Sequence, residues 1–178
     1  VFEVRVSLYH ITDIEIVNDD NLKRISTLIT PHNAVALVPF SENFSEHINM
    51  SAHLCLALDF VQDPGNLGTI IRAAAWFGIK SIICSENCVD VYNPKVVQAS
   101  MGALLHVDVF YRNLEDFLTS ARERSVEVYG TMLDGEPVYS ARLEMKGVVV
   151  LGNESKGISS ELVPFITKKL AIPRFASS

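Results

Sequence analysis

Asn66 and Arg72 stand in the segment DPGNLGTIIRAAAWFG, which follows an apolar run at residues 54–61. A strand that leads through a glycine-containing turn into a helix often binds the phosphates of a nucleotide. Asn66 can cap this helix while its side-chain amide meets a ligand. Arg72 lies less than two turns further on, on roughly the same side of the helix. The residue types and their spacing therefore favour a binding site at the start of the helix.

A dinucleotide is the first candidate ligand for this segment. Its fingerprint requires G-x-G-x-x-G and an acid about twenty residues further on. Gly65 and Gly68 supply G-x-x-G and Glu86 is a suitable acid, but Asp63 occupies the position of the first glycine. No Gly-Lys-Ser/Thr follows, so a P-loop is not indicated either. A nicotinamide-dependent oxidoreductase is thus a weakly supported alternative.

Asn66 and Arg72 each have an ordinary structural interpretation as well. Asn66 taken alone is most simply a helix cap, and Arg72 a surface arginine. Apolar residues flank Arg72 in IIRAAAWF, however. We therefore give equal weight to an arginine held near a pocket or an interface.

The elements around this segment alternate between strand and helix. The predicted strands cover residues 54–61, 81–84, 104–111, 126–133, 147–152 and 169–173. The predicted helices cover residues 66–77, 94–101, 114–125 and 159–166, with Asn93 and Asn113 as caps and Gly78 ending the first. Strands with few polar residues in such an order predict a mostly parallel sheet with helices on both faces. The predicted fold class is α/β.

Glycine-bearing loops follow three of the predicted strands. They read QDPGNLG, TMLDG and GNESKG. Ligands of open α/β sheets bind beyond the carboxyl ends of the strands. We therefore expect the three loops to share one pocket.

The first fifty residues have a less regular pattern. Residues 1–17 and 33–40 are typical of strands, and DDNLKRISTL predicts a short helix capped by Asp20 or Asn21. The polar, aperiodic segment SENFSEHINMSAH is a candidate linker. The sequence therefore predicts a boundary near residue 50.

The composition excludes several classes of protein. Of 178 residues, 48% are hydrophobic and 20% are charged, which is enough to form a core and argues against disorder. The net charge of −6 argues against a large nonspecific nucleic-acid surface, although it leaves room for a local basic groove. Neither a membrane-spanning stretch nor a signal peptide is present in the sequence.

The three cysteines, Cys55, Cys84 and Cys88, cannot all form disulfides with one another. Reduced thiols in a cytoplasmic protein are the expected state. Cys84 and Cys88 lack a second cysteine pair or a histidine cluster that would complete a zinc site. We expect no metal.

Four segments in order carry a resemblance to a known family: PGNLGTIIRAAAWFG, KVVQASMGALLHV, VVVLGNESKGIS and LAIP. Together they resemble the SpoU-type RNA 2′-O-ribose methyltransferases of the SPOUT superfamily. The resemblance runs from about Leu54 to the end of the sequence. It implies a methyltransferase domain over residues 53–178 and, over residues 1–50, the C-terminal part of a small α/β RNA-binding domain.

The resemblance also implies an activity and a fold. The activity is transfer of a methyl group from S-adenosylmethionine to a ribose 2′-hydroxyl of rRNA or tRNA. The fold is a parallel α/β sheet whose C-terminal part forms a deep trefoil knot, and the protein forms a homodimer. The loops should then offer backbone amides and carbonyls to the cofactor, because its methionine tail carries no phosphate.

Matching of the motifs assigns catalytic roles to Asn66, Arg72 and Glu154. It assigns cofactor contacts to two loops and a strand end, namely Gly152, Asn153, Gly157, Ile172, Pro173, Thr131, Met132 and Leu133. The family gives the arginine a central role, sometimes as the base. Because a guanidinium is effectively always protonated, we prefer Arg72 as a clamp for phosphate and the developing alkoxide.

The sequence departs from the family pattern after Ile172 and Pro173. The family continues into a Ser-Leu-Asn segment and a helix, whereas this sequence ends in RFASS. We therefore expect the catalytic domain to lack its C-terminal end and these 178 residues to bind S-adenosylmethionine weakly. A methyltransferase-like RNA-binding module without activity is the alternative function.

Overall fold

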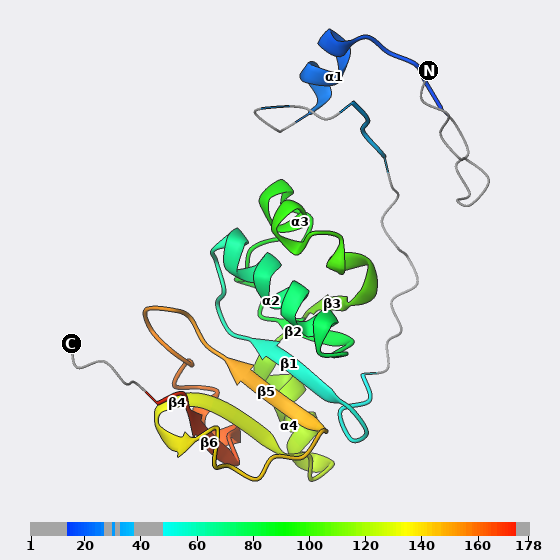
Figure 1. The fold of residues 1–178 in the computed structure, drawn as a ribbon. Coiled ribbons are helices and arrows are strands. Elements are labelled where there is room, and N and C mark those ends of the chain that lie inside the picture. The colour runs from blue at the N-terminus through cyan, green and yellow to red at the C-terminus, as the bar shows by residue number, and fades with distance from the viewer. Residues whose placement is uncertain (1–13, 27–29, 31–32, 38–47, 174–178) are drawn as a thin grey trace. The chain divides into compact units, whose positions relative to one another are not determined.

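The computed structural model describes residues 14–26, 30, 33–37 and 48–173 (Figure 1). The chain divides into two units, Val1–Glu42 and Asn43–Ser178. The division falls inside the predicted linker. The role of the first unit in RNA binding stays a prediction.

The described part of the first unit contains one helix, α1 (Asp19–Ile25). Asn18 caps it, with its side chain accepting a hydrogen bond from the backbone N–H of Asn21. The predicted cap, Asp20 or Asn21, was therefore placed too late, because Asn18 already supplies the side-chain oxygen that the first turn needs. Residues 14–17 and 33–37 form no strand. The other residues of the two strands predicted there lie outside the described part.

The second unit is built on a six-stranded sheet in which every pairing is parallel, in the order β3-β2-β1-β5-β4-β6. Its strands are β1 (Leu54–Leu58), β2 (Ser81–Cys84), β3 (Asp108–Tyr111), β4 (Val128–Pro137), β5 (Gly147–Leu151) and β6 (Lys168–Ala171). All six predicted strands are present, and the predicted α/β fold with a mostly parallel sheet is confirmed.

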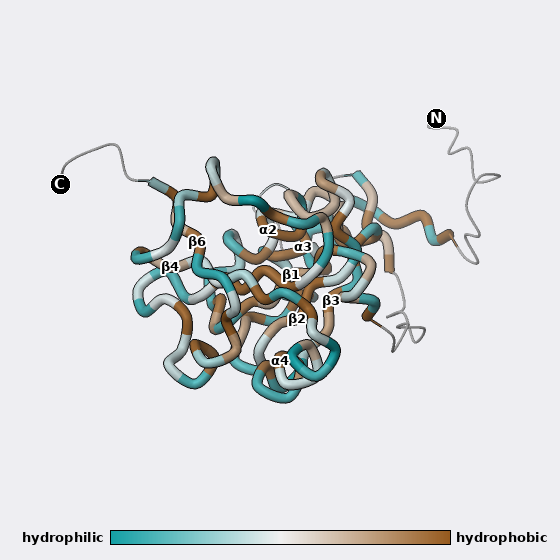
Figure 2. The backbone as a smooth tube through the Cα atoms, turned by 90° about the horizontal axis from the view of Figure 1, so that it is seen from below, coloured by the Kyte–Doolittle hydropathy of each residue, from teal (hydrophilic) through white to brown (hydrophobic). Residues whose placement is uncertain are grey.

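Helices cover both faces of the sheet. They are α2 (Pro64–Trp76), α3 (Pro94–Ser100) and α4 (Leu114–Glu123), with 3₁₀ helices η2 (Ala103–His106) and η3 (Val163–Phe165). Leu56 and Leu58 of β1 belong to the core beneath α2 and α3, whereas Cys55 and Ala57 belong to the core against α4. Successive strand residues point to opposite faces, so one apolar strand serves both cores. Figure 2 shows the apolar strands β1 and β2 between α2 and α3 on one side and α4 on the other.

The local signals set most helix ends. Asn93 and Asn113 cap α3 and α4 as predicted, and Gly78 adopts a left-handed φ of 75° just after α2. Two predicted elements are different. In the predicted strand at residues 104–111, the first residues belong to η2 and only Asp108–Tyr111 form a strand. In the predicted helix at residues 159–166, only Val163–Phe165 are helical, and they form η3.

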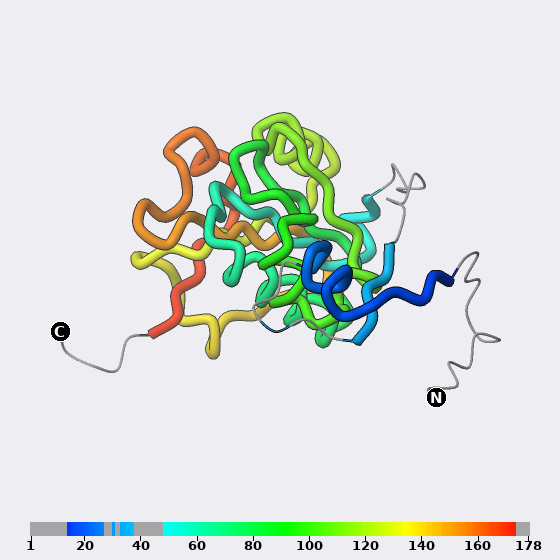
Figure 3. The backbone as a smooth tube through the Cα atoms, turned by 90° about the horizontal axis from the view of Figure 1, so that it is seen from above, coloured from blue at the N-terminus to red at the C-terminus, as the bar shows by residue number. Residues whose placement is uncertain are grey.

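The sheet order brings particular strand ends together. Leu58 at the end of β1 pairs with Leu151 at the end of β5, so the chain leaves both strands side by side. On the other side of β5, Gly130 of β4 pairs with Val150. Figure 3 shows β6 and the residues after it (red) running beside the β4 segment (yellow), as their pairing requires.

Candidate functional site

The loop after β5, residues 152–157, is folded tightly on itself. Asn153 and Gly157 form an isolated antiparallel bridge, with N–H···O distances of 3.0 and 2.8 Å. A Cβ atom on Gly152 would overlap the backbone of Gly157. The loop therefore needs glycine at position 152 for close approach of its two sides. Residues 154–157, at the turn of the loop, are exposed.

The side chain of Asn153 is used inside the protein. Its Oδ1 accepts hydrogen bonds from the backbone N–H groups of Ser155 and Lys156 at 2.9 and 3.1 Å. Its Nδ2 donates to the carbonyl of Phe60 at 2.9 Å. Its backbone N–H and carbonyl are paired with Gly157, so both the side chain and the main chain of Asn153 are used inside the protein.

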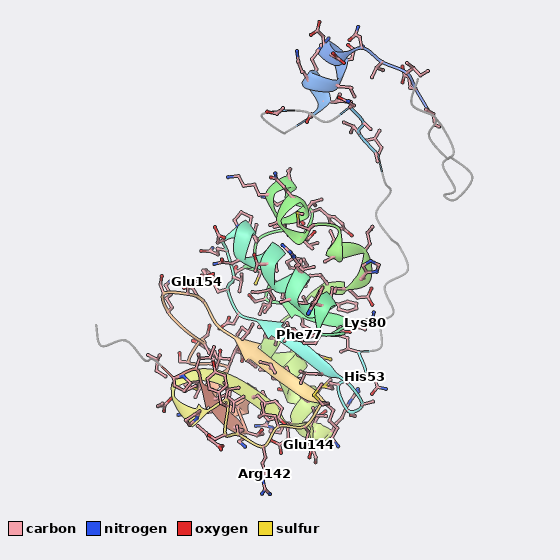
Figure 4. The ribbon with its side chains drawn as sticks, viewed as in Figure 1. His53, Phe77, Lys80, Arg142, Glu144 and Glu154 are labelled. Carbon is pink, nitrogen blue, oxygen red and sulfur yellow. The ribbon has the colours of Figure 1, made fainter. Side chains whose placement is uncertain are left out.

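Asn66 and Glu154 are joined directly. Nδ2 of Asn66 donates to Oε1 of Glu154 at 2.6 Å, across 88 residues of sequence. In Figure 4, His53 marks the beginning of β1, and Glu154 lies near the other end of that strand, from which the chain continues into α2. This contact connects the first turn of α2 to the loop after β5, so two of the three predicted catalytic residues lie together.

The helix α2 is capped by Asp63, because its carboxylate accepts the N–H of Asn66 at 2.8 Å. The prediction that Asn66 caps the helix is wrong. Asp63 comes earlier and has the extended backbone that a cap needs, which leaves the amide of Asn66 free to reach Glu154. A carboxylate at this helix end also disfavours a phosphate there, which counts against the dinucleotide alternative.

Arg72 is exposed, and its side chain forms no hydrogen bond or ion pair with the residues that the structure describes. Six residues of α-helix turn the chain through about 600°, so Arg72 projects about 120° away from Asn66. The expectation that both lie on one side of the helix is therefore wrong. Arg72 instead shares its face with Trp76, four residues on, whose exposure is 84%.

Gly68 has a packing function. A Cβ on Gly68 would overlap Ala99 and the backbone of Val96 in α3. The second glycine of the G-x-x-G spacing thus allows close contact of two helices, and it does not mark a phosphate site.

The predicted cofactor residues Thr131, Met132 and Leu133 lie within β4 rather than at its end. Oγ1 of Thr131 donates to the carbonyl of Val150 in β5 at 3.1 Å. The pairing of β4 with β6 shifts register between Thr131 and Glu136, so the residues between them bulge from the ladder. Leu133 is fully exposed in this bulge.

Ile172 and Pro173 directly follow β6, the neighbour of β4 in the sheet. Ile172 has an exposure of 76%. Ile172 and the bulge residue Leu133 thus present apolar side chains from adjacent strands. Such side chains suit the faces of an adenine ring.

Asp59 and Ser159 were missed by the sequence analysis. Asp59 follows β1 and is only 5% exposed, and its Oδ2 accepts hydrogen bonds from the backbone N–H and the hydroxyl of Ser159. The available signal was a single acid within the apolar run LCLALDFV. An acid in such a run is rarely buried without a specific partner.

The cysteines are free and buried. Hydrogen bonds from Cys84, Ser85 and Val61 lower the pKa of the Cys88 thiol to about 6, whereas burial raises that of Cys55 to about 11. The hydrogen bond with Cys88, followed by burial, raises the pKa of Cys84. In the described part of the chain, no group of three or more His, Cys, Asp or Glu residues is arranged to hold a metal ion.

No helix among the described residues is long and apolar enough to span a bilayer. The candidate site residues lie in α2, within β4, in the loop after β5 and directly after β6, all in the second unit.

Residues 53–177 match the SpoU rRNA Methylase family, and the chain belongs to that family. The match covers the whole sheet and every residue of the site described above. The resemblance seen in the sequence motifs is therefore confirmed.

Particular relatives are similar over most of the chain. A 23S rRNA (guanosine(2553)-2′-O)-methyltransferase, RlmP, from Bacillus subtilis is 28% identical over 162 residues, which are 90% of this chain and 64% of that protein. A solved structure from Porphyromonas gingivalis, assigned to the TrmH family of RNA methyltransferases, is 40% identical with a TM-score of 0.77, covering 93% of this chain and 66% of that one.

A third relative was solved with its cofactor. The AdoMet-bound rRNA methyltransferase from Sinorhizobium meliloti is 36% identical with a TM-score of 0.63, covering 71% of this chain and 50% of that one. The chain thus spans less than two thirds of the length of each of these three proteins.

Proposed function

We propose that this protein transfers a methyl group from S-adenosylmethionine to a ribose 2′-hydroxyl of rRNA or tRNA. The observation that carries the proposal is the hydrogen bond between Asn66 and Glu154, which joins two family motifs at one edge of the sheet. Family membership and the names of the relatives support the same reaction. The decisive test is transfer of a labelled methyl group to RNA, because an inactive RNA-binding module would bind RNA and transfer nothing.

The residues at the sheet edge fit S-adenosylmethionine. Gly152 lets the loop after β5 fold tightly without side-chain bulk, and Leu133 and Ile172 are exposed apolar side chains. The ligand carries no phosphate, which agrees with the carboxylate of Asp63 at the start of α2. When bound, S-adenosylmethionine supplies an electrophilic methyl group on a sulfonium.

The protein's own contribution to the reaction is placement and electrostatics. A ribose hydroxyl is barely acidic, so it must lose or share its proton in the transition state. Arg72 is exposed, and its guanidinium serves as a clamp for an RNA phosphate and the developing alkoxide. Glu154 orients the amide of Asn66 and thereby fixes the start of α2 against the cofactor loop.

Removing the Asn66–Glu154 contact gives a measurable coupling. We expect Asn66→Ala and Glu154→Ala each to lower kcat/KM for methyl transfer, because each change releases the same loop from the helix. The double variant should be about as active as the worse single variant, since contacting residues are non-additive. Steady-state kinetics on the four proteins check this. Effects that simply multiply would show that the two side chains act independently.

The knot and the assembly are further parts of the proposal. The order β5-β4-β6 at one side of the sheet supports a C-terminal trefoil knot of the family type. Trp76 and Phe77, at the end of α2, are 84% and 74% exposed and support a homodimer formed through this helix. Arg72 shares the Trp76 face and would then lie near the interface.

Sedimentation equilibrium tests the dimer. We expect a dimer at micromolar concentration and a shift to monomer for Trp76→Glu, because a charge would be buried at the interface. Lys146→Glu, a charge change at a residue in the exposed segment before β5, is the control and should stay dimeric. A monomeric unmodified protein over this range would contradict the proposal.

The compartment is the cytoplasm in this proposal. The support is the set of three free, buried cysteines together with an RNA substrate. The first unit is proposed to bind the RNA.

A further inference from the structure

Residues 59–61, directly after β1, are hydrogen-bonded on both sides. On one side the backbone N–H groups of Phe60 and Val61 donate to Oγ of Ser85 at 3.0 Å and Sγ of Cys88 at 3.3 Å. These contacts fix the segment to the chain that follows β2. On the other side the segment holds the loop after β5.

The loop after β5 is attached at both of its ends. Near its beginning, Nδ2 of Asn153 donates to the carbonyl of Phe60 at 2.9 Å. At its far end, Asp59 accepts from the backbone N–H of Ser159 at 2.7 Å and from its hydroxyl at 2.6 Å. Two consecutive residues, Asp59 and Phe60, thus fix the separation of the loop's ends. Nζ of Lys156 also lies 5.6 Å from the centre of the Phe60 ring.

The carboxylate of Asp59 has an unusual environment. It is only 5% exposed and belongs to none of the ion pairs found among the described residues. Among the described residues, Ser159 donates both of the hydrogen bonds that the Asp59 carboxylate accepts. Hydrogen bonds to an ionised group are roughly twice as strong as neutral ones. The pair is therefore a strong attachment for the loop.

Phe60 supports the same interpretation. Its φ is 60°, in the left-handed region, which is uncommon for a bulky residue. A conformation of this kind persists only where its surroundings hold it. Here the surroundings are Ser85 on one side and Asn153 on the other.

We propose that Asp59 is a positioning residue for cofactor binding, because it holds the far end of the 152–159 loop through Ser159. This inference rests on the proposed function, in which that loop binds S-adenosylmethionine. Asp59 keeps the loop in its binding conformation before the cofactor arrives. Without it, binding must also order the loop, and the affinity falls. The chemical step at saturating cofactor stays nearly unchanged, because the bound cofactor orders the loop and restores the contact of Glu154 with Asn66.

Three variants of the whole chain test this. Asp59→Asn removes the charge at nearly constant shape, and Ser159→Ala removes one donor and keeps the backbone N–H. Asp108→Asn is the matched control. Asp108 is exposed and is the first residue of β3, whereas Asp59 follows the last residue of the parallel strand β1. Amide hydrogen exchange of residues 153–159, calorimetric affinity for S-adenosylmethionine, and kcat and KM are measured for each.

Asp59→Asn is expected to speed exchange in residues 153–159 but not in α4, and to weaken cofactor affinity by about tenfold or more. KM for the cofactor should rise by the same factor as the dissociation constant, while kcat stays within about twofold of the unmodified value. This is the pattern expected when ground state and transition state lose the same binding energy. Ser159→Ala should act in the same direction and more weakly. Asp108→Asn should match the unmodified protein.

Unchanged exchange of the loop in Asp59→Asn would overturn the inference, and so would unchanged affinity. Equal loss of exchange protection throughout the second unit would also overturn it, because Asp59 would then serve general stability. An unmodified protein that lacks even the weak binding of S-adenosylmethionine expected for these 178 residues contradicts the proposed function instead. In that case the exchange of residues 153–159 still decides whether Asp59 holds the loop.

Discussion

Arg72→Ala lowers the rate of methyl transfer by about 10²–10³-fold, the loss expected for one electrostatic contact made in a transition state. The affinity for S-adenosylmethionine stays nearly unchanged, because Arg72 projects about 120° away from Asn66 and the loop that Asn66 contacts. Single-turnover kinetics with RNA, together with calorimetry of cofactor binding, separate the two quantities.

Arg124→Ala is the control for this prediction. Arg124 is an exposed arginine that caps the end of α4, on the other face of the sheet. It should retain full activity. Arg72→Lys keeps the charge and loses the planar pair of donors, so it should recover only part of the rate. Normal turnover of Arg72→Ala with its RNA would remove Arg72 from the mechanism.

Gly152→Ala is expected to abolish cofactor binding almost completely. Its Cβ would overlap the backbone of Gly157, and backbone atoms cannot move aside as a flexible side chain can. The bridge between Asn153 and Gly157 must then open, and with it the loop surface offered to the ligand. We expect affinity for S-adenosylmethionine to fall by about 100-fold or more, and the free energy of unfolding to fall by about 1–3 kcal/mol.

Gly102→Ala distinguishes a site effect from a general loss of stability. Gly102 has a φ of 82° and open space around it, so an added Cβ brings backbone strain without overlap. It should lower the free energy of unfolding by about 1–2 kcal/mol and leave cofactor affinity unchanged. If Gly152→Ala and Gly102→Ala weaken cofactor binding equally, the tight loop is not the binding surface.

The architecture of the second unit follows from local signals in the sequence. Apolar runs define the six strands, and Asn93, Asn113 and Gly78 set helix ends through their side chains or backbone freedom. These signals act within a few residues of the chain, so they can be recognised without the fold. Family motifs then located Asn66 and Glu154, which the structure brings into contact.

Long-range features could not be predicted in the same way. The pairing of Asp59 with Ser159 joins residues that are 100 positions apart, and only the strand order brings them together. The bulge after Thr131 depends on the register of β4 against β6, which the alternation of side chains does not specify. The angle between Arg72 and Asn66 around the helix axis can be calculated from the sequence spacing alone. The cap could not be assigned with the same certainty, because Asp63 and Asn66 are both suitable cap residues and the structure uses Asp63.

The central claim is methyl transfer to a ribose hydroxyl, and analysis of the reaction product tests it most directly. The protein is incubated with S-adenosylmethionine carrying a labelled methyl group and with unmodified rRNA and tRNA transcripts. The RNA is digested to nucleosides, which are separated and identified by mass spectrometry. We predict that the label is found in a 2′-O-methylnucleoside. In the intact modified RNA, the phosphodiester next to that nucleotide should resist cleavage by alkali. Label on a base, or no transfer by a protein that binds both the cofactor and the RNA, would contradict the account.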